Sequence, residues 1–152
     1  MQEQVSTFNA WIVPGIFIAL AAFWCLICTL IGLVSGWNAL STRFTALSKP
    51  SGEFLQAGPL FHSVYLRFWG HYSSVVRMIS APDALYLSAL FPFRPGHPPL
   101  CIPWNEITFG RTKFLWQKYV VLTLGNEERI PLRISEGMAR KLGLMERVPS
   151  GE

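Results

Sequence analysis

Residues Ile12 to Val34 read IVPGIFIALAAFWCLICTLIGLV, a run of 23 residues without one charged side chain. As an α-helix this run would measure about 34 Å, which exceeds the roughly 30 Å of a bilayer's hydrocarbon core. Because backbone groups in lipid must be hydrogen-bonded within their own segment, only a helix suits it. We therefore expect one transmembrane helix over residues 10–36, preceded by a short tail over residues 1–9.

A cleaved signal peptide is the rival interpretation of the apolar run. No basic region precedes the run, the run is longer than the apolar core of a signal peptide, and no small-residue cleavage site follows it cleanly. A permanent anchor is therefore the expectation.

The residues flanking the run predict how the chain sits in a membrane. Trp11 and Trp37 bracket it as interfacial anchors do, and Arg43 and Lys49 follow it as cations suited to anionic headgroups. All 13 Lys and Arg residues lie at or after Arg43, whereas the tail carries only Glu3. By the positive-inside tendency we expect a single-pass protein of the inner (plasma) membrane of the cell, with its N-terminus outside and its C-terminal domain in the cytoplasm.

Two patterns inside the run predict contacts or chemistry. Gly32 and Gly36, like Gly15 and Ala19, have the small-xxx-small spacing that lets helices approach closely, which predicts a homodimer or a contact with another membrane protein. The sequence Trp-Cys-Leu-Ile-Cys at residues 24–28 looks like the Trp-Cys-x-x-Cys of thioredoxin-like redox proteins. In lipid, however, polar oxidants do not reach the thiols, and the alternative is two small apolar side chains.

Beyond the span, apolar residues recur at three- and four-residue intervals, at Trp37, Leu40, Phe44 and Leu47. This spacing predicts an amphipathic juxtamembrane helix, which a Pro-Ser-Gly sequence at residues 50–52 ends. We expect residues 37–52 to form this helix and a linker. The apolar stripe would lie on the membrane interface or pack on the following domain.

From residue 53 onward, short runs rich in β-branched and aromatic residues alternate with Pro, Gly and Asp, which is typical of successive strands. We expect an α+β protein whose domain over residues 53–152 is a small, bent antiparallel sheet or barrel of six or seven strands. The expected strands are residues 54–61, 64–69, 74–79, 84–91, 100–104, 114–124 and 129–134.

Turn and cap signals refine this domain. Pro82-Asp83 and Gly125-Asn126 predict turns, and Pro131 predicts an edge strand because proline cannot donate to a sheet ladder. Ser135 predicts the N-cap of a terminal helix over residues 135–146, which would cover one face of the sheet.

Three motifs carry a resemblance, namely Gly36-Trp37-x-x-Leu40, Asp83-x-Leu85-Tyr86-Leu87 and Gly96-His97-Pro98-Pro99-Leu100-x-Ile102-Pro103-Trp104-x-Glu106-Ile107. With them the chain resembles a set of small uncharacterised bacterial single-pass membrane proteins. Its second half also resembles pleckstrin-homology (PH) or GRAM-like domains, which implies a seven-stranded bent sheet capped by the helix. That resemblance implies a binding platform rather than a catalyst, without phosphoinositide specificity, because the first hairpin has no Lys-x-Arg motif.

Exposed cations predict a binding face if their strands are neighbours, and these cations are Arg111, Lys113, Lys118, Arg129 and Arg133. Near an anionic leaflet each such cation contributes about 1 kcal/mol; the alternative is an ordinary solvated surface. His97 lies in a proline-rich loop, which is either a rigid connection or a partner-binding loop.

The sequence favours no catalytic or nucleic-acid chemistry. It has no nucleophile elbow, no phosphate-binding glycine loop, and no carboxylate pair near a histidine. Its three histidines lack metal-ligand spacing, and its net charge of +4 is not gathered in a nucleic-acid-binding motif. We expect no enzyme activity, no cofactor, no metal and no nucleic acid.

Three functional hypotheses follow. The first is a non-catalytic module that is tethered to the lipid bilayer and contacts anionic lipid headgroups or a protein partner. The second is a structural subunit of a larger membrane assembly, with the helix as the main interface. The third is a membrane thiol-redox protein.

Overall fold

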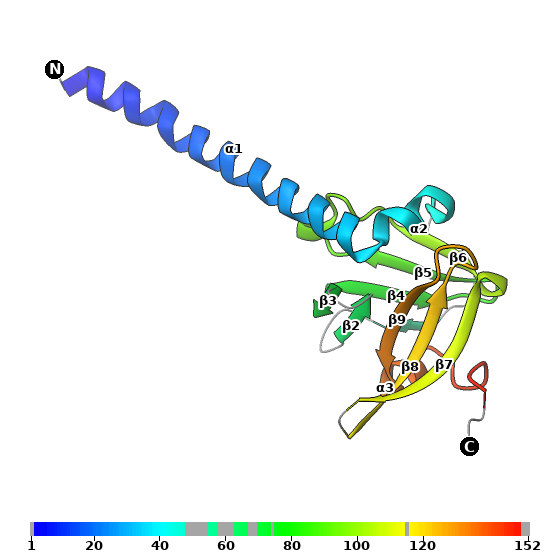
Figure 1. Cartoon of the computed structure of the whole chain (residues 1–152). Helices are drawn as coiled ribbons and strands as arrows, with labels where there is room; N and C mark the ends of the chain where they lie inside the picture. The colour runs from blue at the N-terminus through cyan, green and yellow to red at the C-terminus, as the bar shows by residue number, and fades with distance from the viewer. Residues whose placement is uncertain are drawn as a thin grey trace.

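A long N-terminal helix precedes two antiparallel sheets and a short C-terminal helix in the computed structural model of the protein (Figure 1). The structure describes residues 2–47, 55–57, 63–66, 70–73, 75–114 and 116–149. The α+β class with one N-terminal apolar helix, expected from the sequence, is confirmed.

The N-terminal helix α1 covers Gln2–Ser35, and its stretch Trp11–Ser35 is long and apolar enough to cross a membrane. The helix thus begins inside the expected tail over residues 1–9. It ends at Gly36, whose φ of 86° is left-handed and favours glycine. The juxtamembrane helix α2 then covers Trp37–Phe44, so the two helices are separated by a turn instead of forming one continuous rod.

The first sheet has the strand order β1-β4-β5-β6 and is antiparallel throughout. Its strands are β1 (Leu55–Ala57), β4 (Val76–Ser80), β5 (Ala84–Ala89) and β6 (Leu100–Pro103). The predicted turn at Pro82-Asp83 is confirmed between β4 and β5, where the backbone N–H of Ala81 donates to the Ala84 carbonyl at 3.0 Å.

The second sheet has the order β3-β2-β9-β8-β7. Its strands are β2 (Ser63–Leu66), β3 (Gly70–Ser73), β7 (Ile107–Phe114), β8 (Gln117–Leu124) and β9 (Ile130–Ser135). The described residues therefore hold nine strands in two sheets, where the sequence predicted six or seven in one.

Two expectations for the second sheet are wrong. Residues 114–124 were expected as one strand, but Phe114 pairs with Gln117 across a hairpin, and β7 is the long strand that precedes it. Pro131 does not lie on an edge strand, because β9 lies between β2 and β8. The described pairing of β9 with β2 involves only Arg133 and Leu132, so Pro131 lies outside that ladder.

The terminal helix α3 covers Glu136–Lys141, which is shorter than the expected range 135–146. Ser135 is its N-cap as predicted, since the Ser135 hydroxyl accepts a hydrogen bond from the backbone N–H of Met138 at 3.3 Å. The helix contacts β1, β8 and β9 and therefore covers an end shared by both sheets.

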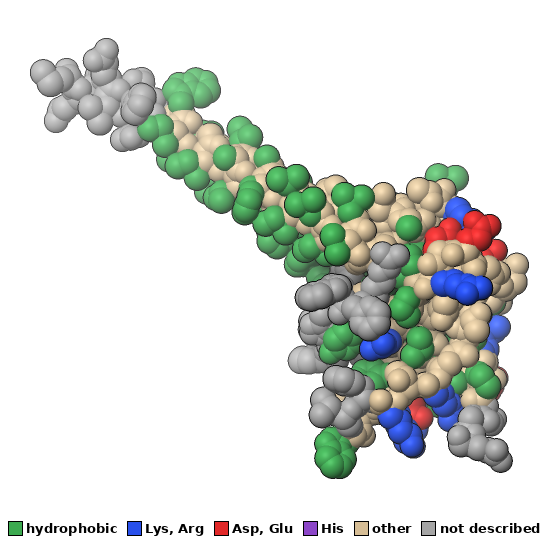
Figure 2. Space-filling model, in the orientation of Figure 1, with side chains coloured by type: hydrophobic (Ala, Val, Ile, Leu, Met, Phe, Trp, Pro, Cys, Tyr) green, Lys and Arg blue, Asp and Glu red, His purple; other side chains and the backbone are tan. Residues whose placement is uncertain are grey.

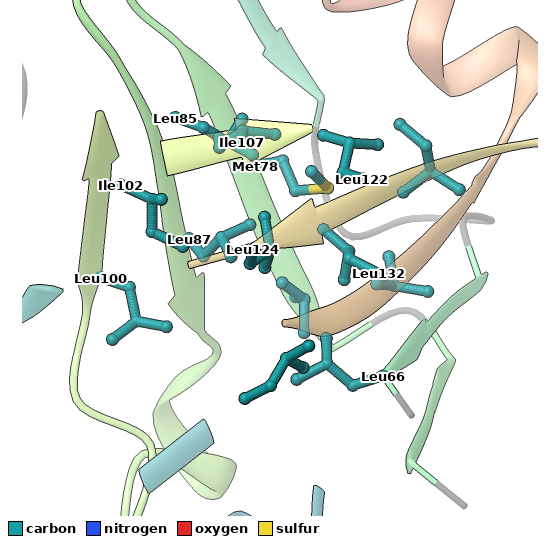
Figure 3. Packing of buried hydrophobic residues seen from close by; sticks show 14 of the residues in the cluster. Leu66, Met78, Leu85, Leu87, Leu100, Ile102, Ile107, Leu122, Leu124 and Leu132 are labelled. Carbon is teal, nitrogen blue, oxygen red and sulfur yellow. The ribbon is translucent and has the colours of Figure 1, made fainter. Parts of the chain in front are cut away.

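Both sheets place alternate side chains in one hydrophobic core (Figure 3). Met78, Leu85 and Leu87 come from the first sheet, and Leu122 and Leu132 from the second; all five are at most 1% exposed. Burying a side chain of this size stabilises the fold by about 1.5–3 kcal/mol. The apolar side of α2 belongs to the same core, with Trp37, Leu40 and Phe44 buried, so these three residues of the predicted stripe pack on the domain. Leu47, the fourth residue of that stripe, lies beyond the end of α2 and is exposed.

Candidate functional site: a docking segment and a basic groove

The connection between β5 and β6 lies against α1, and we call residues 91–99 the docking segment (Figure 1). It begins with the 3-10 turn η1 (Phe91–Phe93). The Trp24 indole N–H donates to the Pro92 carbonyl at 2.5 Å, and the rings of Trp24 and Phe93 are 5.4 Å apart between centroids. The domain is therefore fixed to the helix more than a turn before the helix ends.

The two helix cysteines differ in their surroundings. Cys28 is 2% exposed, with its sulfur 3.8 Å from the Pro92 carbonyl oxygen, whereas Cys25 is exposed on α1. Both are free thiols. The Trp-Cys-x-x-Cys pattern thus places one cysteine in a packing contact beneath the docking segment.

Two glycines make the close approach between helix and segment. Gly32 lies against the backbone carbonyl of Gly96, and a Cβ on Gly96 would lie 2.6 Å from the Cα of Thr29. Gly96 also has a φ of +73°, which side chains rarely adopt. The close approach predicted from the spacing of Gly32 and Gly36 is found at Gly32, where it is made to the chain's own loop; the predicted contact with a second helix stays a prediction.

Trp37 is fully buried, so the prediction that it is an interfacial anchor is wrong. Its indole N–H donates to the Pro98 carbonyl at 2.8 Å, and its ring meets that of His97 edge-on, with 5.2 Å between centroids. Trp11, the other predicted anchor, is 81% exposed on α1.

His97 is a buried histidine of the docking segment, 2% exposed. Burial lowers the pKa of His97 below its ordinary value near 6.5, and hydrogen bonds to the carbonyls of Pro95 and Phe93 oppose this shift only in part. The neutral ring therefore belongs to the folded state.

Acidification is expected to destabilise this contact. The unfolded chain binds a proton at His97 at higher pH than the folded chain, so the stabilisation is complete above about pH 6.5 and is lost as the pH falls below it. We expect the melting temperature to fall between pH 7 and pH 5, and His97→Gln to reduce that fall. Thermal unfolding of both proteins across this range measures the effect; equal pH dependence in the two would contradict it.

Arg43 forms ion pairs with carboxylates of its own domain. Its guanidinium lies 3.7 Å from Glu106, 3.3 Å from Glu127 and 3.4 Å from Glu128, and Figure 2 shows acidic side chains gathered beside α2. The structure therefore places Arg43 in an ion-pair cluster of its own domain, and its contact with headgroups stays a prediction. Lys49, predicted beside it, lies outside the described residues.

Because the Arg43 cluster is partly exposed, its contribution is expected to be small and dependent on salt. Arg43→Gln should lower the free energy of unfolding by about 1 kcal/mol or less at low ionic strength. The difference from the wild type should shrink in 1 M salt, where the screening length is about 3 Å. Denaturant melts at two salt concentrations test this; a difference that grows with salt would show that packing dominates.

The five cations predicted to share a face do not do so. Lys113 pairs with Lys118, and Arg111 with the buried Val120, so these three cations lie on the core-facing side of the β7–β8 hairpin. Arg133 pairs with Val121 and is on the opposite side, since neighbouring residues of a strand alternate.

Arg129 is also separate from the hairpin cations. It lies in the β8–β9 turn, with a φ of 46° and its backbone N–H bonded to the Gly125 carbonyl at 3.0 Å. This turn confirms the one predicted at Gly125-Asn126. It follows the far end of β8, roughly 20 Å from Lys118 at 3.3 Å per residue.

Three of the predicted cations line a groove of about 440 Å³, which we call the basic groove. Its walls are Arg111, Thr112, Lys113, Lys118, Tyr119, Val120, Glu136 and Pro149. The groove forms because the β7–β8 hairpin extends beyond the core, so the face that buries Ile107 near its base carries cations near its tip. With three cations and one carboxylate, this groove favours an anionic ligand.

The sequence missed the docking segment as a contact with α1, although its four prolines and the glycine at residue 96 signalled a rigid, closely packed loop. Among the residues that the structure describes, no three His, Cys, Asp or Glu side chains are grouped as a metal site requires. No protein-family model, curated protein or solved structure matches the chain.

Proposed function

We propose that the protein is a non-catalytic binding module, tethered to the membrane by α1, whose basic groove binds an acidic segment of a protein partner. The observation that carries this proposal is the convergence of Arg111, Lys113 and Lys118 on one face of a single hairpin. None of the three forms an ion pair with a described residue. Their charges are therefore available to a ligand.

The position of the groove favours a partner in water over lipid headgroups. The β7–β8 hairpin points away from the free end of α1 (Figure 1). With α1 across the bilayer, the groove would face the aqueous side, away from the headgroups, whose charge acts over only roughly 8 Å at physiological salt. Tethering raises the local concentration of such a module near membrane-bound partners.

The membrane placement is part of the same proposal. Trp11–Ser35 meets the length of a span, and every Lys and Arg follows it in the sequence, which supports a plasma-membrane protein with its domain in the cytoplasm. The resemblance to PH and GRAM-like domains supports a binding platform, since two antiparallel sheets with a C-terminal helix suit one.

The test uses the full chain in nanodiscs of phosphatidylcholine and a fluorescent peptide of ten glutamates as the probe. Lys113→Gln with Lys118→Gln should weaken binding by up to about thirtyfold, because two partly exposed charge contacts contribute at most about 1 kcal/mol each. The matched control removes two charges outside the groove, at Arg129 and Lys141. Binding that falls equally in both variants, or no binding by the wild type, would contradict the proposal.

A further inference from the structure

The docking segment carries an exposed aromatic residue beside the membrane helix. Phe91 is 83% exposed, and the turn that contains it is fixed to Trp24, well inside the apolar run of α1. An aromatic side chain in this position is costly in water and favourable at the boundary of a bilayer.

The length of α1 sets the depth of this turn. A span of about 20 residues that starts at Trp11 ends near Leu30, which places Trp24 roughly 9 Å inside the apolar layer. In the other limiting case, the span starts as early as possible, just after the charged Glu3. A span of the same length then ends near Trp24. Under both limits, the turn that touches Trp24 lies at the boundary of the hydrocarbon or below it.

Lipid tolerates irregular backbone only where the polar groups are satisfied. Four of the nine residues of the docking segment are prolines, which have no backbone N–H to satisfy. The N–H groups of Phe93, Arg94 and His97 bond to the carbonyls of Leu90, Phe91 and Arg94, respectively.

Three of these prolines also have their own carbonyls hydrogen-bonded. The indoles of Trp24 and Trp37 donate to Pro92 and Pro98, and the Ala46 N–H donates to Pro99 at 2.8 Å. Hydrogen bonds thus satisfy much of the segment's backbone, as a loop at membrane depth requires.

Its only formal charge is compatible with that depth. Arg94 is exposed, and a long arginine side chain can place its guanidinium among the headgroups while its stem stays in apolar surroundings.

We infer that the docking segment is a second membrane contact, in which Phe91 and Pro92 enter the bilayer boundary beside α1. This inference rests on α1 spanning the membrane, as proposed above, and is independent of the basic groove. The domain would then lie flush against the bilayer in a fixed orientation.

The test places the photoreactive residue p-benzoylphenylalanine at one position of the full chain, in liposomes of radiolabelled phosphatidylcholine. Phe91 is the test position, and Phe17, 68% exposed on α1, reports whether the helix is in lipid. Trp116, 97% exposed at the β7–β8 turn, is the matched aqueous control. All three side chains are exposed, so the replacements leave the core unchanged.

The expected result is lipid adducts from positions 17 and 91 and none from 116. Adducts from position 17 alone would overturn the inference while leaving the membrane span intact. No adduct at 17 would overturn both, and an adduct at 116 equal to that at 91 would show that lipid capture is not specific to the docking segment.

Discussion

Gly32→Ala is expected to lower the stability of the whole protein, although alanine is the better helix former. Its new methyl group would collide with the backbone carbonyl of Gly96, which cannot move as a flexible side chain would. Overpacking of this kind costs about 1–3 kcal/mol, or several degrees of melting temperature for a domain of this size. Thermal unfolding in a mild detergent, followed by near-ultraviolet circular dichroism, measures the loss.

Gly15→Ala is the matched control on the same helix. A Cβ at Gly15 meets nothing within 4 Å, so this variant should melt at the wild-type temperature or slightly above it. Gly96→Ala should lower the melting temperature at least as much as Gly32→Ala, because it adds the strain of a left-handed backbone conformation to the collision. The double variant should lose less than the sum of the two, since both break one contact. Equal melting of Gly32→Ala and Gly15→Ala would rule out the docking contact.

Trp37→Ala is expected to cost about 3–5 kcal/mol, the usual range for a large aromatic residue removed from a core. Trp37 is fully buried, and it joins α2, the docking segment and the sheets. Trp116→Ala, at an exposed turn position, should leave the unfolding free energy within about 0.5 kcal/mol of the wild type. Denaturant unfolding of the two variants under the same conditions provides the comparison.

Trp37→Phe separates the ring from its hydrogen bond. It keeps an aromatic side chain but leaves the half-buried carbonyl of Pro98 without its donor, which costs about 1 kcal/mol or more. An interfacial anchor would behave differently, because phenylalanine would leave the stability of the domain unchanged. A Trp37→Phe protein as stable as the wild type would therefore contradict the buried role of Trp37.

The local features of the fold were predictable from the sequence because short-range chemistry decides them. The apolar run, the Ser135 cap, and the turns at Pro82-Asp83 and Gly125-Asn126 each depend on a few neighbouring residues. The juxtamembrane stripe was also predicted, but its partner was not, since periodicity shows that a face is apolar without showing what covers it.

The strand β7 was missed because its pattern changes along its length. Ile107 and Phe109 lie on the same face as Arg111 and Lys113, so the apolar alternation stops where the hairpin leaves the core. That same extension creates the basic groove. Arg111 and Arg133 lie on opposite faces of the sheet, and this follows from the strand register, which the sequence alone does not give.

The contacts of α1 and α2 with residues 91–99 join positions more than 60 residues apart, and no local pattern encodes such a pairing. The glycine spacing correctly signalled a close approach at Gly32. It could not identify the partner, because a proline-rich loop and a second helix require the same lack of a side chain.

The central claim is that the apolar helix α1 and the β-domain are one packed unit. The most direct measurement is nuclear Overhauser spectroscopy of the full chain in phosphatidylcholine nanodiscs, with tryptophan, phenylalanine, tyrosine and histidine selectively labelled. Cross-peaks between the rings of Trp24 and Phe93, and between those of Trp37 and His97, are expected from centroid distances of 5.4 Å and 5.2 Å. If the Tyr65–Tyr119 cross-peak of the folded sheet is present while both of these are missing, the domain is folded but not docked, and the account is wrong.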